Sequence, residues 1–371
     1  MMEINNAYLD KVEERHFSIA REKKALGAKI VGIYCAFTPK EIIAAAGAIP
    51  VALCSGSNES IPKAEEHLPR NLCPLVKASY GSAITERCPY FFMADILVAD
   101  ATCDGKKKMY ELMSRVKEVH LLNLPQIANL KGSFDLWLSE LHRFKGFLEK
   151  ETDSLVSDEK LWESIKLYNR VRELKRTIFE LNRGPIPLLS GRELSIAVDS
   201  GGFEVDLPGD IDRYLQVIDF AKQRGGIKPR PRILLTGCPT TSEKVLHCLE
   251  EYANVVAMEN CGGLKSIVEL VDETGNPMAA IARSSLRLAC PCMSPNELRY
   301  QLIASIIEDY SIDGVVDLIW QACHTYNIES YSLGDFVRRE KGVPFLQIET
   351  DYSDSDINWI NLRIEAFIEM L

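Results

Sequence analysis

The chain has 371 residues, of which 46% are hydrophobic and 26% are charged, and its formal net charge is −10. This length favours two domains, and the composition is that of a globular protein. Nucleic acid is not an expected partner, because a phosphate backbone calls for a basic face and the only basic run is the short Lys106–Lys108. No apolar run approaches the ~18 residues of a membrane-spanning helix, and the N-terminal residues lack the pattern of a signal peptide. We therefore expect a cytoplasmic protein without a membrane partner.

The N-terminal part alternates predicted helices and strands. A charged amphipathic helix over 7–28 precedes a strand over 29–35, a short helix over 42–46 and a strand over 49–53. Thr38 is the predicted N-cap of the second helix, with Pro39 at its first position. The order strand, helix, strand predicts a parallel unit.

Cys103 occupies a distinctive position in the next unit. The apolar run at 96–98 predicts a buried strand, and the apolar spacing over 106–117 predicts an amphipathic helix. Cys103 therefore lies where a parallel strand passes into a helix, the edge at which open α/β sheets bind ligands. Free N–H groups at the helix start favour an anion there, such as a thiolate.

The rest of the chain repeats this organisation after a helical stretch. The pattern over 133–225 predicts charged helices and contains no candidate binding or catalytic residues. These helices are expected to bridge the domains and to supply a dimer surface. A second α/β region begins at about 229, with predicted strands over 232–236, 254–258, 314–320 and 343–349 and helices from 242, over 298–310 and over 359–371. Cys261 and Cys323 repeat the placement of Cys103. Both halves thus carry thiols at a strand-end edge, and the two edges are expected to face one cleft.

Eleven cysteines need an explanation in a chain of this kind. Disulfides are rare in a reducing cytosol, and an odd number argues against complete pairing. Cys54 and Cys248 are interpreted as ordinary free thiols. Most of the others lie at strand ends or beside proline or glycine, and the Cys-Pro dipeptide recurs at Cys73, Cys88, Cys238 and Cys290. This placement favours metal ligation.

An iron–sulfur cluster suits the spacing better than the other candidate centres. Structural zinc uses compact paired ligands, and Cys290/Cys292 is the only close pair. Redox thiols of the thioredoxin type need C-x-x-C, which is absent, and neither a P-loop nor a G-x-G-x-x-G fingerprint occurs. Dispersed thiols can reach a cubane from distant turns because a cubane is large.

Several segments give the chain a family resemblance along nearly its whole length. They are Tyr34-Cys35 with Pro39-Lys40-Glu41, Leu72-Cys73-Pro74, Thr102-Cys103-Asp104-Gly105, Gln321-Ala322-Cys323-His324 and Glu349-Thr350-Asp351-Tyr352. Together they resemble the 2-hydroxyacyl-CoA dehydratase and benzoyl-CoA reductase superfamily. The resemblance implies two α/β domains clasping a [4Fe–4S] cubane, with Cys73, Cys103 and Cys323 at the positions of the three ligands.

The additional cysteines make the chain most similar to the double-cubane cluster proteins of this superfamily. That resemblance implies a homodimer in which each chain holds two cubanes joined by a sulfide, with electrons supplied by an ATP-dependent iron–sulfur reductase. Two cubanes need six thiolates, and the candidate ligands are Cys73, Cys88, Cys103, Cys261, Cys290, Cys292 and Cys323. Cys35 and Cys238 are outside this set but would be able to displace a member.

Three hypotheses concern the roles of individual side chains, and each has a structural alternative. His324 would donate a proton to a bound substrate, or simply pack beside the cluster loop. Glu259 and Asp104 would relay protons or, as the preferred interpretation, cap the turns that follow them. Lys106–Lys108 would dock an acidic reductase or form a solvated helix face.

The expected fold is α/β, with two Rossmann-like domains whose parallel sheets face a cluster-binding cleft. We expect an N-terminal domain over 1–150, a helical connecting region over 151–228 and a C-terminal domain over 229–371. The expected function is an [8Fe–9S] reductase that passes low-potential electrons to a small unsaturated substrate. Two alternatives stand: a 2-hydroxyacyl-CoA dehydratase subunit with one [4Fe–4S] cluster, and a non-enzymatic electron-storage or cluster-carrier protein.

Overall fold

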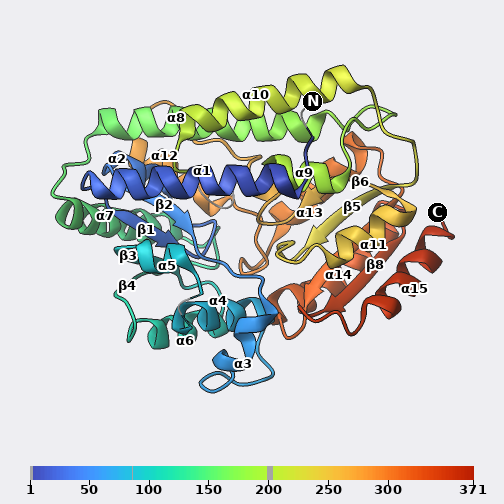
Figure 1. The fold of residues 1–371 in the computed structure, drawn as a ribbon, viewed down its shortest axis with the longest axis horizontal. Coiled ribbons are helices and arrows are strands. Elements are labelled where there is room, and N and C mark those ends of the chain that lie inside the picture. The colour runs from blue at the N-terminus through green and yellow to red at the C-terminus, as the bar shows by residue number, and fades with distance from the viewer. Residues whose placement is uncertain (1–2, 86, 199–203) are drawn as a thin grey trace.

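A computed structural model describes residues 3–85, 87–198 and 204–371 of the chain. It contains two four-stranded parallel sheets, one from each half of the chain, with helices packed around both (Figure 1). The predicted α/β class with Rossmann-like halves is therefore confirmed. The boundaries predicted at 150 and 228 stay predictions, although the helices that link the two sheets fall between residues 133 and 224.

The N-terminal sheet has the strand order β2-β1-β3-β4. Its strands are β1 (Ile30–Ile33), β2 (Ile49–Ala52), β3 (Ile96–Asp100) and β4 (Val119–Leu122). The helices of this half are α1 (Asn6–Ala25), α2 (Lys40–Ala45), α3 (Ile61–Ala64), α4 (Pro74–Ile84), α5 (Pro89–Met93) and α6 (Asp104–Met113). From β1 the chain adds β2 on one side of the sheet and then β3 and β4 on the other side. The gap between the carboxyl ends of β1 and β3 is therefore the topological switch point.

Alternate residues of the central strands face two different layers of helices. Val31, Ile33 and Val98 pack with α2, α7, α8 and α12, whereas Ile30 and Leu97 pack on the opposite side with α4, α5 and α6. Side chains of a strand point to opposite faces in turn, so apolar residues at every position predict a sheet covered on both faces. The buried pattern of β1 and β3 agrees with this.

The C-terminal sheet repeats the topology with the order β6-β5-β7-β8. Its strands are β5 (Arg232–Gly237), β6 (Asn254–Glu259), β7 (Gly314–Trp320) and β8 (Phe345–Thr350). Its helices are α11 (Lys244–Tyr252), α12 (Pro277–Leu286), α13 (Glu297–Asp309), α14 (His324–Glu340) and α15 (Ile357–Ile368). The switch point of this sheet lies between β5 and β7.

Four helices connect the two sheets: α7 (Ser133–Thr152), α8 (Asp158–Glu180), α9 (Gly191–Val198) and α10 (Leu207–Arg224). Helices α8 and α10 pack against each other and run along the top of Figure 1, above α1. No helix among the described residues is both long enough and apolar enough to pass through a bilayer.

One segment of the C-terminal half packs against the N-terminal half. Helix α12 lies against α7 and α8, where the Trp137 indole donates to Ser285 at 2.8 Å. The Asn169 side chain of α8 also pairs with the backbone of Val271, at 2.7 and 3.0 Å. Cys292 and Cys290, which follow α12, consequently join the apolar cluster that contains β1 and α7.

The predicted N-cap at Thr38 is wrong. Helix α2 begins at Lys40, and its N-cap residue is Pro39, which makes no side-chain cap. The Thr38 hydroxyl instead donates to the buried Asp100 carboxylate at 2.7 Å. A tertiary partner on the next strand thus replaces the local hydrogen bond that the sequence pattern suggests.

His120 gives the N-terminal half an acid-sensitive point. Its ring stacks on Phe147 at 4.2 Å, its Nε2 is buried without a hydrogen-bond partner, and burial lowers its pKa to about 4. The unfolded chain binds a proton near pH 6.5, so folding stability is complete above that pH and decreases as the pH falls toward 4.

We expect the free energy of unfolding of His120→Phe, measured with urea, to exceed that of the native chain by about 1 kcal/mol at pH 5. The difference should be much smaller at pH 8. His142→Gln on the exposed side of α7 is the control and should show no such pH-dependent difference. Equal effects of His120→Phe at both pH values would contradict the assignment.

Candidate functional site

The two sheets carry cysteines at equivalent positions. In each sheet a cysteine follows each of the first three strands in chain order: Cys35, Cys54 and Cys103 after β1, β2 and β3, and Cys238, Cys261 and Cys323 after β5, β6 and β7. All strands within a sheet are parallel, so these residues lie at the carboxyl edge of each sheet. Cys35 with Cys103, and Cys238 with Cys323, flank the two switch points.

A first set of thiols gathers around Cys323, and we call Cys73, Cys103, Cys238 and Cys323 the Cys323 group. Hydrogen bonds from Cys238 and Cys73 lower the pKa of Cys323 well below its usual range. The bond to Cys323, together with burial, raises the pKa of Cys73. Burial raises the pKa of Cys103, and the charge of Cys323 raises it further. The group contains two cysteines from each half, so the carboxyl edges of the two sheets face each other.

A second set gathers around Cys290, and we call Cys35, Cys261, Cys290 and Cys292 the Cys290 group. A hydrogen bond from Cys292, followed by the charge of Lys265, lowers the pKa of Cys290 to about 6 against the effect of burial. Burial raises the pKa of Cys35, and the charges of Cys290 and Cys261 raise it further. Cys35 comes from the N-terminal half and the other three from the C-terminal half.

Helix starts direct backbone N–H groups at the sulfurs of the Cys323 group. Cys103 is the N-cap of α6 and accepts from the Lys106 N–H at 3.5 Å, and Cys73 precedes Pro74 at the start of α4. Cys323 precedes α14 and accepts from the Tyr326 N–H. Such bonds stabilise thiolates and set the potential of a bound iron–sulfur cluster.

The backbone before two of these cysteines adopts unusual conformations. Gly237 has φ of 106°, and a Cβ there would lie 2.2 Å from the Leu318 carbonyl oxygen, so only glycine fits directly before Cys238. Ala322, before Cys323, has φ of 57°, which costs a non-glycine residue about 1–2 kcal/mol. The strained backbone therefore lies directly beside two members of the Cys323 group.

Not every cysteine belongs to a group. Cys88 is the N-cap of α5 and is half-buried, and its sulfur accepts from the N–H groups of Phe91 and Tyr90. Its predicted role as a cluster ligand stays a prediction. Cys248 is buried inside α11, as expected of a structural thiol. Cys54 donates to the Tyr34 carbonyl oxygen at 3.4 Å and lies near the Cys290 group.

Two lysines approach the thiols. Lys106 donates to the Tyr34 carbonyl oxygen at 3.0 Å, directly before Cys35, whereas Lys107 and Lys108 are exposed and pair with Asp104 and Glu111. Lys265, in the turn after Cys261, is only 1% exposed and donates to the Tyr326 hydroxyl. The solvated helix face predicted for Lys106–Lys108 therefore applies to the last two lysines.

Neither acidic residue singled out from the sequence is a helix cap. Asp104 is exposed and pairs with Lys107. Glu259 is fully buried and accepts from Thr236 at 2.5 Å and from Arg299 at 3.1 Å. The preferred capping interpretation is therefore wrong for both. A proton-relay role for either stays a prediction.

His324 is the first residue of α14 and is exposed beside Cys323. Its predicted role as a proton donor stays a prediction. Asp100, at the end of β3, is a carboxylate that sequence analysis did not single out. Burial raises its pKa to about 7, against the opposing effect of its bond from Thr38.

The thiol groups do not form a site for a single metal ion. Within 3–85, 87–198 and 204–371, no three Cys, His, Asp or Glu side chains converge closely enough to hold one ion. Four thiols that would repel one another as thiolates nevertheless share each site, and a larger cationic core such as a cubane removes that repulsion. The donor set therefore fits an iron–sulfur cluster.

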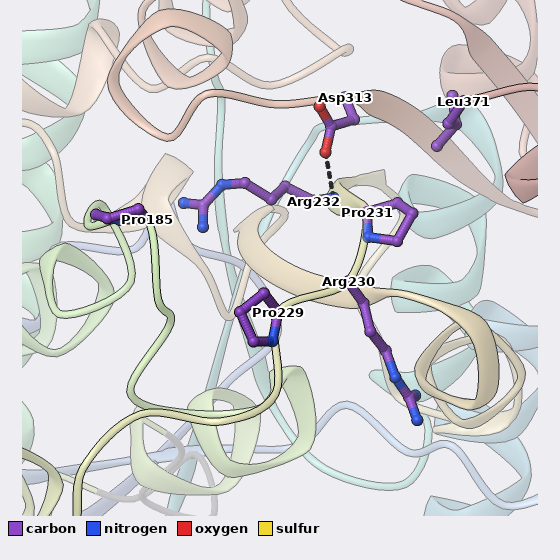
Figure 2. Close-up of a pocket in the computed structure, with 7 residues that line it drawn as sticks. All are labelled: Pro185, Pro229, Arg230, Pro231, Arg232, Asp313 and Leu371. Atoms are coloured by element: carbon purple, nitrogen blue, oxygen red, sulfur yellow. Dashed lines mark hydrogen bonds between the residues drawn. The ribbon is translucent and has the colours of Figure 1, made fainter.

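The two cavities described in the structure lie away from the thiols. One, of about 360 Å³, lies near the amino ends of β5 and β7 (Figure 2). Asp313 accepts there from the Arg232 backbone N–H at 2.7 Å, and the Arg232 guanidinium is occupied by backbone carbonyls. The other, of about 450 Å³, lies between α14 and β8. Neither is lined by cysteine.

Fold and site together define an α/β protein with facing sheet edges and thiols contributed by both halves. Residues 35–371 match the family model described as 2-hydroxyglutaryl-CoA dehydratase, D-component, so the chain belongs to that family. This confirms the superfamily resemblance found in the sequence.

The relatives are subunits of dehydratases and reductases. The Escherichia coli protein YjiM, provisionally assigned as a dehydratase subunit, is 42% identical over 96% of this chain and 94% of its own length. The (R)-phenyllactyl-CoA dehydratase beta subunit of Clostridium sporogenes is 24% identical over 99% and 98%. One of the subunits of benzoyl-CoA reductase from Thauera aromatica is 23% identical over 46% and 45%. The chain thus belongs to a family of enzyme subunits.

Two members of the thiol groups, Cys35 and Cys238, lie outside the ligand set predicted from the sequence. Cys35 follows β1 by two residues and Cys238 follows β5 by one, so the strand-end rule that identified Cys103 also applies to them. Lys265 and Tyr326 carry no comparable signal, because only the tertiary structure brings them beside the thiols.

Proposed function

We propose that this chain is an iron–sulfur reductase that holds an [8Fe–9S] double cubane and receives low-potential electrons from an ATP-dependent iron–sulfur partner. The observation that carries the proposal is the division of eight thiols into two groups of four, each drawn from both halves of the chain. Each cubane of a double cubane needs three thiolates, so each group contains enough ligands for one.

The chain's own residues would perform three tasks at this centre. Cys323, Cys73 and a third member of their group would hold one cubane, while Cys290, Cys292 and Cys35 or Cys261 would hold the other. Backbone N–H groups at the starts of α4, α6 and α14 would stabilise the sulfurs. When bound, the cluster supplies one-electron chemistry, and the apolar clusters that contain Cys73, Cys238 and Cys292 would cover part of it.

A 2-hydroxyacyl-CoA dehydratase subunit with one [4Fe–4S] cluster is the second candidate. Full-length similarity to the (R)-phenyllactyl-CoA dehydratase beta subunit supports it. Cys73, Cys103 and Cys323 would then be the ligands, and the Cys290 group would remain free thiols. A carrier or electron-storage protein differs from both by the lack of any substrate.

Iron and sulfide analysis of the chain purified without oxygen separates these candidates. We expect about 8 iron atoms per chain for the double cubane and about 4 for the dehydratase cluster. A second measurement, of substrate reduction with an ATP-dependent reductase partner, separates an enzyme from a carrier. A colourless, iron-free and fully active preparation would contradict the proposal, and a homodimer is expected by light scattering.

A further inference from the structure

Strand β8 is an edge of the C-terminal sheet, with β7 as its only neighbour there. The N–H of Val315 donates to the carbonyl oxygen of Pro344 at 2.9 Å, just before β8 begins. With the observed parallel register, the even-numbered residues of β8 then bond to β7. The backbone N–H and C=O groups of Phe345, Gln347 and Glu349 therefore point away from β7, to the outside of the sheet.

The outer side of β8 borders a groove. Within 3–85, 87–198 and 204–371, the outward backbone groups of β8 have no hydrogen-bond partner. The cavity of about 450 Å³ lies beside them, and it is lined by Phe345 and Gln347 of β8, Tyr331 of α14 and Arg363 of α15. The free edge of the strand is therefore accessible between two helices.

The other three sheet edges carry features that hinder pairing with another strand. Strand β2 contains Pro50, every residue of β6 is buried, and β4 has only four residues. Edge strands that stay single are usually short, covered, or interrupted by proline, lysine or a bulge, because an open edge pairs with other chains. The six residues of β8 include neither proline nor lysine and pair with β7 without a register shift.

Large apolar side chains are exposed on both helices beside the groove. Helix α14 exposes Ile328 and Tyr331, and α15 exposes Trp359 and Leu362. Helices α7, α8 and α10, from the region where the sequence pattern places a dimer surface, expose only one large apolar side chain each. Figure 1 shows α14, β8 and α15 together, well away from α8 and α10. Removal of apolar area from water stabilises an interface, so the exposed apolar groups favour the β8 side.

Two opposite charges at the groove have no partner in their own chain. The Arg338 guanidinium lies 5.6 Å from the centre of the Phe345 ring, and neither Arg338 nor Glu349 forms an ion pair within the described residues. The side chains of Gln347 and Glu349 both bond to Asn327 of α14. Arg338 and Glu349 therefore lie on the same face of β8, one near each end of the strand.

We propose that β8 is a dimer interface, where it pairs antiparallel with β8 of a second copy of this chain around a two-fold axis at Gln347. This inference rests on the homodimer of the proposed function and not on its cluster. Phe345 then faces Glu349 of the partner subunit, and the outward backbone groups of β8 are all paired. Arg338 meets the partner subunit's Glu349 beside that ring, and the symmetry forms this ion pair twice.

The mass of the particle in solution tests the strand pairing. Light scattering and sedimentation are measured for the native chain, Gln347→Ala and Gln347→Pro. We expect two copies for the native chain and for Gln347→Ala, which keeps the backbone N–H. Gln347→Pro should be monomeric with a native circular dichroism spectrum, because proline removes only an outward N–H and places its ring at the pairing edge.

Charge reversal tests the paired side chains. Arg338→Glu and Glu349→Arg should each raise the dissociation constant of the dimer about 100-fold, because like charges then face each other twice. The double variant Arg338→Glu/Glu349→Arg should restore the native dimer, which a general loss of structure would not do. Arg170→Glu, at an exposed position of α8, is the control and should leave the dimer intact.

The outcomes separate this interface from the function on which it rests. A dimeric native chain that stays dimeric as Gln347→Pro and as Arg338→Glu contradicts the β8 interface alone. A monomeric native chain with full iron contradicts the homodimer together with this interface, and it leaves the double cubane in place. A dimer without iron contradicts the proposed function and not the interface. A double variant that does not restore the dimer contradicts the pairing of Arg338 with Glu349 of the partner subunit.

Discussion

Replacing Cys323 by alanine is expected to lower the iron content of the chain, purified without oxygen, to about half of the native value. Cys323 is the sulfur toward which both Cys73 and Cys238 direct hydrogen bonds, so its loss removes the centre of one group while the Cys290 group keeps its four thiols. Iron and sulfide per chain and the visible absorption spectrum measure the effect.

The matched control is Cys248→Ala. Cys248 is also buried and free, but it lies within α11 and outside both groups. We expect it to keep full iron and to lose about 1 kcal/mol of stability from the small cavity. Equal iron losses in the two variants would indicate general unfolding, and full iron in Cys323→Ala would remove Cys323 from the ligand set.

The largest effect on stability is expected for Arg299→Met. The Arg299 side chain is fully buried, and its Nη1 lies 2.6 Å from Glu329 Oε2 while its Nη2 lies 3.0 Å from Thr236 Oγ1 and 3.7 Å from Asp317 Oδ1. Methionine has a similar length but leaves the carboxylates of Glu259, Asp317 and Glu329 without their shared cation. Breaking a buried pair in this way costs about 3–5 kcal/mol.

Urea unfolding at pH 7 measures this loss. The control is Arg287→Met, because Arg287 pairs with Glu269 at 3.0 Å on the surface and its side chain is 55% exposed. Such a surface pair contributes about 0–1 kcal/mol. A loss in Arg299→Met no larger than in the control would show that the buried carboxylates are neutral in the folded chain.

Much of the fold follows from local sequence pattern. The apolar runs that form β1, β3, β5 and β7 are short and end in polar or small residues, so their type and order are predictable. Strand β4 and helix α12 were not predicted. The residues of β4 alternate between half-buried and buried positions, so they form no continuous apolar run. Helix α12 does carry a local start signal, Asn276 as N-cap followed by Pro277.

The sequence predicts where the site lies but not which thiols belong to it. Position after a parallel strand identifies Cys103, Cys261 and Cys323, because carboxyl edges bind ligands whatever the ligand is. Which thiols meet depends on how the two sheets face each other, and no local pattern encodes that. The same limit explains why Thr38 bonds to Asp100.

The Cys323 group takes two thiols from each half, so neither half alone supplies three thiolates for the cubane proposed there. During synthesis the first sheet would be finished while its partners in the second sheet have yet to be made, and Cys323 arrives only with the strand–helix unit of β7 and α14. Insertion of the cubane held by the Cys323 group would therefore follow docking of the two halves, and that cubane would then hold the halves together. Any ligand that binds only the docked arrangement stabilises it, so chelation should loosen the halves and expose the segment between β7 and α14 to proteases.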